Sequence, residues 1–175
     1  MKPSLVFLAA ATTLVAAVSA SAQLMAAPAP SLAVANLPPA TRPGEVVLYG
    51  HVKSLTPNGS RFQLRFDPAW WLTGLTAKRA KLEDTGSSEV PNDYYIVEEG
   101  HRLLTYFVPA TAHVTILTRA GIPANLGGTP ITVSELAQIV KGRNPRGRQL
   151  MEPKAGFWIR VAGDTVRSLD QQYQP

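Results

Sequence analysis

The sequence predicts an α+β fold, either a curled antiparallel sheet or a small, partly open β-barrel of about seven strands, with two or three short helices. Two observations support this class. Short runs in which apolar and polar residues alternate are separated by turn residues, which is the pattern of half-buried strands. Between some of these runs lie segments that begin with helix-capping residues. We therefore expect a sheet with one buried and one solvent-facing side.

Residues 46–55 and 61–66 predict the first β-hairpin. In the second run phenylalanine and leucine alternate with glutamine and arginine at the period of a strand. The Pro-Asn-Gly sequence at 57–59 supplies a turn between the two runs. Gly50, inside the first strand, predicts a bulge or a tight bend that would curl the sheet.

Asp67 and Pro68 predict the start of a helix. An aspartate accepts hydrogen bonds from the amides of a first turn, and a proline at the first helical position gives up no hydrogen bond there. This helix would carry the Trp-Trp-Leu sequence at 70–72. Thr73 would then cap a second helical stretch over 75–82, which a polar loop ends.

The central part of the chain predicts three more strands, at 94–97, 102–108 and 113–118, from their β-branched and aromatic residues. Because turn residues connect these runs, we expect a three-stranded meander. Residues 119–130 are rich in glycine and predict a loop.

A capping box marks the next helix. Thr132 and Glu135 stand three residues apart before an apolar run that continues to Val140, and Lys141 and Gly142 close it.

The end of the chain predicts a second hairpin. Its strands lie at 157–161 and 166–169, joined by the Ala-Gly-Asp sequence at 162–164.

The first 22 residues predict an export signal. A positive charge at Lys2 precedes an uncharged apolar run over 5–18, and the Ala-Ser-Ala sequence at 20–22 offers small residues to a signal peptidase. A retained membrane anchor is the alternative, although this run is shorter than the ~20 residues that span a bilayer. Residues 23–44 predict an Ala/Pro-rich tether, and 45–175 a single globular domain.

The amino-acid composition limits the chemistry, the location and the partners that we expect for the protein. The chain has no cysteine, which excludes a disulfide framework, a thiol nucleophile and a cysteine-ligated metal. After cleavage 16 Lys and Arg would face 12 Asp and Glu, a net charge of +4, well below a nucleic-acid-binding footprint. We expect a secreted or extracytoplasmic protein of a bacterial cell envelope, with no membrane span after cleavage. Its expected partners are an anionic envelope polymer or another envelope protein, and no specific nucleic acid.

One cluster of aromatic, acidic and amide residues is the main candidate binding site. Asp67 and Asp93 are candidates to share a cation or to act as acid and base of a hydrolase, but an N-cap and a turn are the simpler roles. The aromatic residues, together with Trp158, are candidates for a stacking platform for sugar or peptide, or for a structural anchor. The candidate residues are Asp67, Trp70, Trp71, Asn92, Asp93, Tyr94 and Tyr95.

A second candidate is a basic loop formed by Lys141, Arg143, Arg146 and Arg148. Such a loop attracts anionic polymers, although a solvated loop without a ligand is the simpler interpretation. His51, His101 and His113 lack the short spacing of metal ligands and any local triad signature. The sequence therefore predicts no catalytic residue, no metal and no cofactor.

Three segments carry a resemblance to a known kind of protein: FDPAWWLTG at 66–74, VPNDYYI at 90–96 and the C-terminal run from 156 to 175. With them the chain resembles a family of small exported bacterial proteins of unknown function. That family pairs an Asp-x-x-x-x-Leu-Thr-Gly segment with a later Asn-Asp-Tyr-Tyr-Ile. The resemblance implies motif positions but no activity, cofactor or catalytic residue.

These observations together predict an exported, non-enzymatic binding or interaction domain. Two alternatives stay open. One is an envelope hydrolase that uses Asp67 and Asp93, whose carboxyl groups would have to lie ~5 to 9.5 Å apart. The other is a structural or inhibitory protein without a small ligand, whose aromatic residues would be buried.

Overall fold

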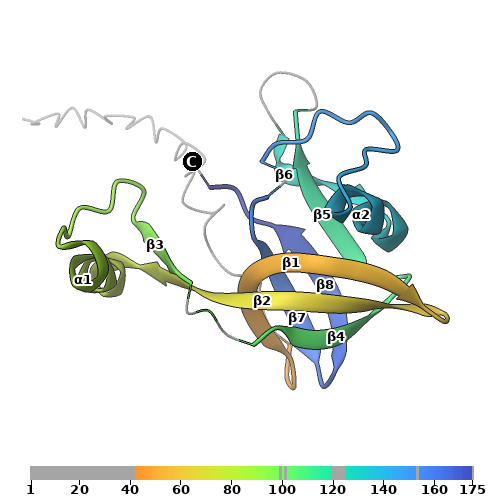
Figure 1. Ribbon diagram of the computed structural model, residues 1–175, viewed down its shortest axis with the longest axis horizontal. Coiled ribbons are helices and arrows are strands. Elements are labelled where there is room, and N and C mark those ends of the chain that lie inside the picture. The colour runs from red at the N-terminus through yellow and green to blue at the C-terminus, as the bar shows by residue number, and fades with distance from the viewer. Residues whose placement is uncertain (1–41, 99, 101, 120–124, 153, 175) are drawn as a thin grey trace, which may run out of the picture. The chain divides into compact units, whose positions relative to one another are not determined.

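The computed structural model describes residues 42–98, 100, 102–119, 125–152 and 154–174. These residues fall in one compact unit of α+β class, a mixed sheet with two helices (Figure 1). The strands are β1 (Val46–Asn58), β2 (Arg61–Thr73), β3 (Tyr94–Val97), β4 (Leu104–Pro109), β5 (His113–Thr118), β6 (Asn125–Ile131), β7 (Phe157–Ala162) and β8 (Thr165–Gln171), and the helices are α1 (Gly74–Thr85) and α2 (Val133–Val140).

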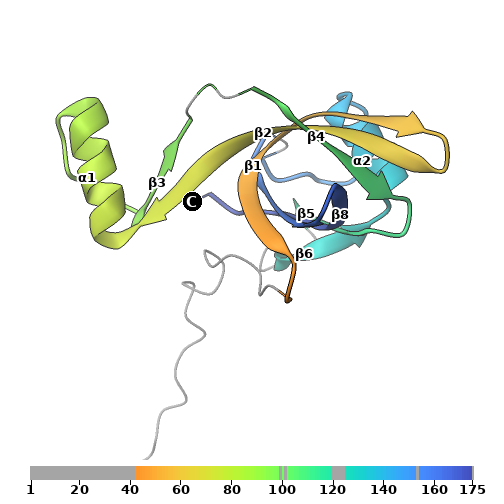
Figure 2. The same ribbon diagram turned by 90° about the horizontal axis from the view of Figure 1, so that it is seen from below.

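The sheet curls back on itself through its pairings. β1 lies between β2 and β7, β7 pairs with β8, and β4 joins β2 to β8, so that the pairings return to their starting strand. β5 and β6 extend the sheet from β8, and β3 extends it from the end of β2. The long, bent β1 and β2 arch across the other strands in Figures 1 and 2.

Two features differ from the expected antiparallel meander. β8 pairs in parallel with both β4 and β5, which makes the sheet mixed. Among the described pairings, β3, β4 and β5 do not pair with one another; each instead joins a strand far away in the sequence. The meander was therefore the wrong interpretation, because short strands with turn residues between them do not specify their partners.

The helix predicted at Asp67 and Pro68 is also wrong. β2 runs without interruption through this point to Thr73, and Asp67 lies opposite His51 of β1. Trp71, which follows, packs against Tyr49 of β1 and Trp158 of β7 as a strand residue, so tertiary packing overrides the local helix-start signal.

The position of Pro68 explains why a strand tolerates it. β4 pairs with residues 61–66 of β2 and β3 pairs with residues 70–73, so among the described pairings Pro68 has a neighbour only in β1. A proline, which has no amide hydrogen, is accepted where one edge of a strand has no partner.

Both predicted hairpins are confirmed. Gly59, between β1 and β2, and Gly163, between β7 and β8, have φ of 61° and 62°, the left-handed conformation that glycine adopts without strain. The bulge expected near Gly50 occurs slightly later, because the register between β1 and β2 shifts between Val52 and Ser54. Gly50 itself marks a close approach of the two backbones.

The segment 119–130, expected to be a loop, contains β6 over its second half. β6 pairs with β5 in antiparallel register, with Thr129 opposite Ile116. Glycine lowers the intrinsic strand propensity of this segment, and the pairing with β5 stabilises the strand in spite of that low propensity.

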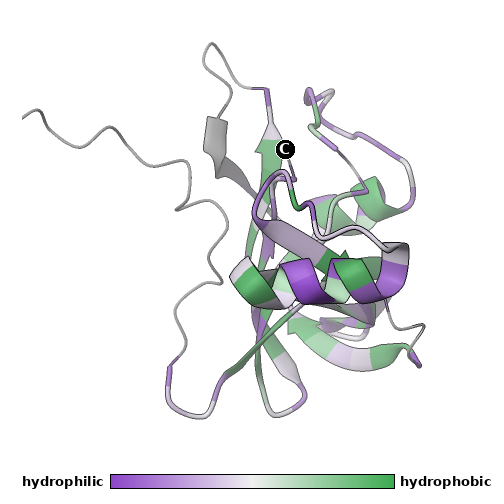
Figure 3. Ribbon diagram, turned by 90° about the vertical axis from the view of Figure 1, so that its left-hand side faces the viewer, coloured by the Kyte–Doolittle hydropathy of each residue, from purple (hydrophilic) through white to green (hydrophobic). Residues whose placement is uncertain are grey.

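Helix α1 matches the second predicted helical stretch. It starts after Thr73, whose side chain makes no capping hydrogen bond, and ends at Gly86 in the left-handed conformation. Hydrophilic and hydrophobic residues alternate along its ribbon (Figure 3), and only Ala77 is buried. α1 lies beside β3 at the end of β2, whereas α2 lies near the other end of that strand (Figure 2).

Helix α2 confirms half of the capping box. The Thr132 hydroxyl accepts a hydrogen bond from the Glu135 amide at 3.1 Å. The Glu135 side chain does not return to the start of the helix but turns toward two arginines of the following loop. The buried face of α2 packs on the main core, whose largest members are Phe66, Leu55, Leu64, Ile116, Leu136, Ile159 and Leu169.

Candidate functional site

The two candidate carboxylates, Asp67 and Asp93, lie far apart, one in the middle of β2 and the other beside its end. Asp67 lies in mid-strand with its Oδ2 2.9 Å from Nζ of Lys53. Asp93 precedes β3, and Tyr94 pairs with Thr73 at the far end of β2. Thr73 stands six positions after Asp67 in the strand, a span of roughly 20 Å. That span exceeds the separation of a glycosidase carboxylate pair.

Asp93 forms the turn that the sequence predicts. Its amide donates a hydrogen bond to the Val90 carbonyl at 3.1 Å, and its φ of 55° is one that Asp and Asn adopt more readily than other non-glycine residues. Burial raises the pKa of the Tyr94 phenol above its ordinary value, and a side-chain hydrogen bond with Asn92 opposes part of this rise. This turn positions the start of β3.

The structure brings part of the aromatic set together. Trp71 stacks on Tyr94 with ring centroids 4.2 Å apart, and Trp158 of β7 approaches Trp71 at 6.0 Å. Tyr49 of β1, which the sequence analysis did not select, lies 5.0 Å from both tryptophans and is the centre of the cluster. Tyr49 belongs to the strand predicted over 46–55, but the burial pattern of that strand does not alternate around it, so no local signal marked it as the centre of a cluster.

Trp70 and Tyr95 point elsewhere. Trp70 is 56 % exposed, since neighbouring strand residues face opposite sides of a sheet. The Tyr95 hydroxyl donates a hydrogen bond to Asp84 of α1, and Lys81 lies 5.1 Å above its ring. Tyr95 therefore attaches α1 to β3 and does not join the aromatic cluster.

The aromatic cluster is mostly structural. The Trp158 indole donates to Gln172 at 2.8 Å, and Gln174 donates to the Tyr49 hydroxyl at 2.5 Å, so the C-terminal segment closes over it. Burial raises the Tyr49 pKa far above its ordinary value. A pocket of about 220 Å³ remains beside these rings, and its lining includes Pro68, Ala69 and Trp70 of β2.

The predicted basic loop is largely engaged within the protein. Arg148 Nε lies 2.6 Å and Arg146 Nε 3.4 Å from the carboxylate of Glu135, whose side chain is only 4 % exposed. Arg143 donates to the Gln138 side chain at 3.3 Å. Two of the four cations, Arg146 and Arg148, therefore fasten the loop to α2. Lys141 and Arg143 are exposed and have no carboxylate contact among the described residues, so they are the members that an external partner could reach.

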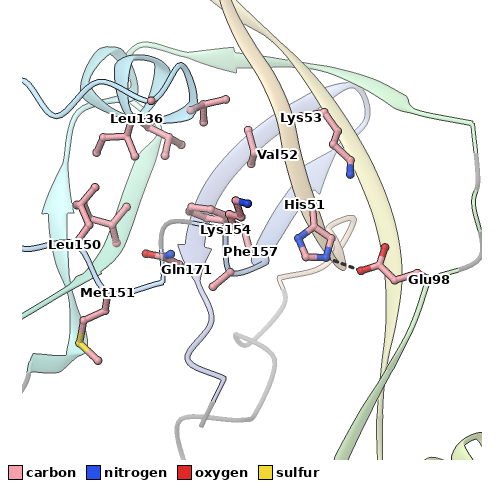
Figure 4. Close-up of a pocket in the computed structure, with 15 residues that line it drawn as sticks. His51, Val52, Lys53, Glu98, Leu136, Leu150, Met151, Lys154, Phe157 and Gln171 are labelled. Carbon is pink, nitrogen blue, oxygen red and sulfur yellow. Dashed lines mark hydrogen bonds and ion pairs between the residues drawn. The ribbon is translucent and has the colours of Figure 1, made fainter.

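A larger pocket of about 580 Å³ lies between the arch of β1 and helix α2 (Figure 4). One side is apolar and comes mainly from α2 and from the segment that leads into β7. Its main residues are Leu136, Ile139, Val140, Leu150, Met151 and Phe157.

The other side of this pocket is polar and comes mainly from β1 and the end of β3. His51 Nε2 lies 2.7 Å from Glu98 Oε1, an ion pair if the imidazole is protonated. Lys53 borders the same edge and forms its ion pair with Asp67, and this hydrogen bond raises the lysine pKa. Lys154 completes the lining from the segment before β7.

Gln171 fixes the floor of the pocket. Its side-chain oxygen accepts from the Leu117 amide at 2.7 Å, and its side-chain nitrogen donates to the Glu152 carbonyl at 2.9 Å. Both contacts connect β8 to other segments of the lining. Gln171, like His51 and Lys53, is therefore held in place by contacts within the protein, which favours a preformed pocket.

The sequence shows no metal-ligand spacing for the three histidines. Of these, His51 and His113 are described by the structure, and His101 lies outside the described residues. His113 Nε2 lies 3.8 Å from the Asp170 carboxylate at an exposed position. No group of three or more metal-ligating side chains occurs in the described part of the chain. The pairing of His51 with Glu98, 47 residues away in the sequence, had no local signal.

Comparison with family models, with curated proteins and with solved structures finds no match to this chain. The resemblance to exported proteins of unknown function therefore stays a prediction. Within the described ranges, neither helix has the length and apolar character needed to cross a membrane.

Proposed function

We propose that the chain is an exported, non-enzymatic binding domain and that the 580 Å³ pocket is its binding site. The pocket itself is the observation that supports this proposal. Its volume lies within the ~300 to 1,000 Å³ of small-molecule sites, and it combines an apolar wall with a few fixed polar groups, as such sites do. In this proposal the seven residues of the aromatic and acidic cluster build the scaffold and do not contact the ligand.

The proposed location is the secreted or extracytoplasmic space of a bacterial envelope, and it rests on the signal-like first 22 residues. The Ala/Pro-rich segment 23–44 would hold the domain away from a surface. An anionic envelope polymer stays a candidate partner through Lys141 and Arg143, the outward-facing members of the basic loop. We also propose that the ring of strand pairings acts as a small, partly open barrel that keeps the pocket walls in place.

The separation of Asp67 and Asp93 along β2 favours binding over the hydrolase alternative. The pocket likewise favours binding over a purely structural role, because a structural domain has no need of a preformed apolar cavity with a polar edge. The structural alternative predicts that a small apolar molecule does not bind in the pocket.

The test uses N-phenyl-1-naphthylamine, an uncharged dye whose fluorescence rises in apolar surroundings. The full chain should enhance its emission in a saturable manner. Val140→Trp, which fills the pocket from the end of α2, should abolish this enhancement. Leu75→Trp, on the exposed face of α1, is the matched control and should leave it unchanged.

Thermal unfolding of both variants shows whether the fold is intact. Saturable enhancement that Val140→Trp leaves unaffected would mean that the dye binds elsewhere, and the proposed site would be wrong. Absence of enhancement with the unsubstituted chain would favour the structural alternative.

A further inference from the structure

The large pocket has apolar and charged side chains in its lining. α2 and the segment before β7 provide aliphatic side chains, Phe157 at the start of β7 provides an aromatic ring, and the charged side chains include His51 and Lys53 of β1 (Figure 4). A ligand that fills such a pocket must itself have an apolar part and a polar head at one end, because burial of a polar group against the aliphatic wall is unfavourable.

The charged groups at the polar edge differ in whether they already have partners. The Glu98 carboxylate is engaged by His51 at 2.7 Å, and the Asp67 carboxylate beside the pocket is engaged by Lys53 at 2.9 Å. Lys154 also lines the pocket, and it forms no ion pair with any residue that the structure describes. Among the described lining residues, Lys154 is therefore a cation without a carboxylate partner, whereas the Glu98 carboxylate already has a hydrogen-bond partner.

The presence of a cation without a partner determines which charge the polar head of the ligand should carry. A cationic head would have to displace His51 or Lys53 from its carboxylate, and Lys154 would repel it. An anionic head would pair with Lys154 directly, and the hydrogen bonds it accepts from an ammonium are stronger than those between neutral groups. The second and third ammonium hydrogens of Lys53 are additional donors on the same edge.

We propose that the pocket binds a single-chain amphipathic anion, with its apolar chain against α2 and Phe157 and its carboxylate or phosphate head at Lys154 and Lys53. This inference rests on the proposed function, since it names the ligand class of the same pocket. A fatty carboxylate and an alkyl phosphate share this chemistry.

The experiment displaces N-phenyl-1-naphthylamine from the full chain with four molecules that have the same ten-carbon chain: decanoate, decyl phosphate, decanol and decylamine. All are used below their aggregation concentrations. We expect an anion to displace the dye at about one tenth of the decanol concentration, the effect of one charge-assisted contact. Decylamine should be the weakest competitor. The ranking of decanoate against decyl phosphate identifies which anionic head the edge prefers.

Variants at Lys154 connect the preference to the proposed head site. Lys154→Gln should reduce the advantage of decanoate over decanol to about twofold or less, while displacement by decanol stays unchanged. Lys154→Arg should keep most of the advantage because it keeps the charge. Lys78→Gln, on exposed α1, removes one positive charge elsewhere and is the control for net charge.

Three results would overturn the ligand class. These are equal displacement by decanoate and decanol, stronger displacement by decylamine, and an anion preference that Lys154→Gln leaves intact. In each of them the dye still binds, so the proposed binding function survives. Failure of the dye to bind at all is the separate result that overturns both proposals.

Discussion

Gly50 lies where β1 and β2 come closest together. A Cβ at this position would overlap the carbonyl oxygen of Asp67 and lie 2.8 Å from Cα of Pro68. Both are backbone atoms in a paired strand, so no side-chain rotation relieves the overlap. Gly50 also pairs with Phe157 of β7 on its other side, which prevents β1 from moving away. Only glycine, which has no Cβ, allows the two strands to approach so closely at this residue.

We therefore expect Gly50→Ala to lower the free energy of unfolding by more than ~3 kcal/mol, the range of severe packing defects. Gly59→Ala is the matched control. Its added Cβ meets nothing within 4 Å, and only its φ of 61° is unfavourable, at a cost of roughly 1 to 2 kcal/mol. Urea unfolding measures both variants. Equal losses would show that β1 and β2 separate readily at Gly50.

Asp67 should contribute little to stability in its observed place. Its ion pair with Lys53 is half-exposed on the lysine side, and solvent-screened pairs are worth roughly 0 to 1 kcal/mol. Asp67→Asn and Lys53→Gln should each change the free energy of unfolding by less than ~1 kcal/mol, and the double variant should give a coupling of the same small size. Urea unfolding of the four proteins measures this cycle. A loss above ~2 kcal/mol for Asp67→Asn alone would contradict this assignment.

At the scale of elements, Glu135 connects α2 to the loop that follows it. The carboxylate accepts from Arg148, and Arg146 lies beside its other oxygen. The loop leads to Leu150 and Met151, which line the large pocket. A buried carboxylate is thus compensated by two cations, and the same contacts hold one wall of the pocket in place.

Glu135→Gln should destabilise the chain by about 3 kcal/mol, because it leaves the arginines without their anion at a partly buried place. Hydrogen exchange should show reduced protection at residues 143–150, while β1 and β2 are less affected. Arg143→Gln, which loses only a hydrogen bond to Gln138, is the control and should change stability by less than ~1 kcal/mol. Unchanged protection in Glu135→Gln would mean that the loop is held by other contacts.

The elements differ in how far the sequence predicts them. Both hairpins and α2 follow from local periodicity, turn residues and Thr132 as a cap, and these signals act within a few residues. The local signal at Asp67 and Pro68 fails because packing of Trp71 against Tyr49 outweighs it. The parallel pairings of β8 and the position of β6 likewise depend on contacts that are distant in the sequence.

The pocket is the least predictable feature for the same reason. Its lining comes from β1, α2, β5, β8 and the segment before β7, and no two of its charged residues form a recognisable spacing. His51 and Lys53 are visible as polar residues of a predicted strand. Only the curled sheet shows that they lie opposite an apolar helix face.

At the scale of the whole described unit, Tyr49 connects the N-terminal strand to the C-terminal end. Its ring packs against both Trp71 and Trp158, and its hydroxyl accepts a hydrogen bond from Gln174, 125 residues later. Gly156 lies directly against this ring, so any side chain there would collide with it. The burial that these contacts produce raises the Tyr49 pKa far above 10.0.

This shift predicts a loss of stability at alkaline pH. The unfolded chain releases the Tyr49 proton near its ordinary pKa of 10.0, whereas the folded chain retains it to higher pH. Above about pH 10 the unfolded state therefore binds fewer protons than the folded state, and the free energy of unfolding falls as the pH rises. Below about pH 9 both states keep the proton, and this contribution is fully present.

Tyr49→Phe separates this effect from the other ionisable groups. At neutral pH the variant should be less stable by about 1 kcal/mol, because it loses the hydrogen bond from Gln174. As the pH rises to about 11, the difference from the unsubstituted chain should shrink, since phenylalanine has no proton to release. Gln174→Ala loses the same hydrogen bond but keeps the phenol, so its stability should fall at least as steeply as that of the unsubstituted chain. Urea unfolding at about pH 8 and about pH 11 measures all three proteins. Parallel losses in Tyr49→Phe and the unsubstituted chain would mean that Tyr49 ionises as readily in the folded state as in the unfolded one. The packing of Trp71 and Trp158 around the phenol would then not be the cause of a raised pKa.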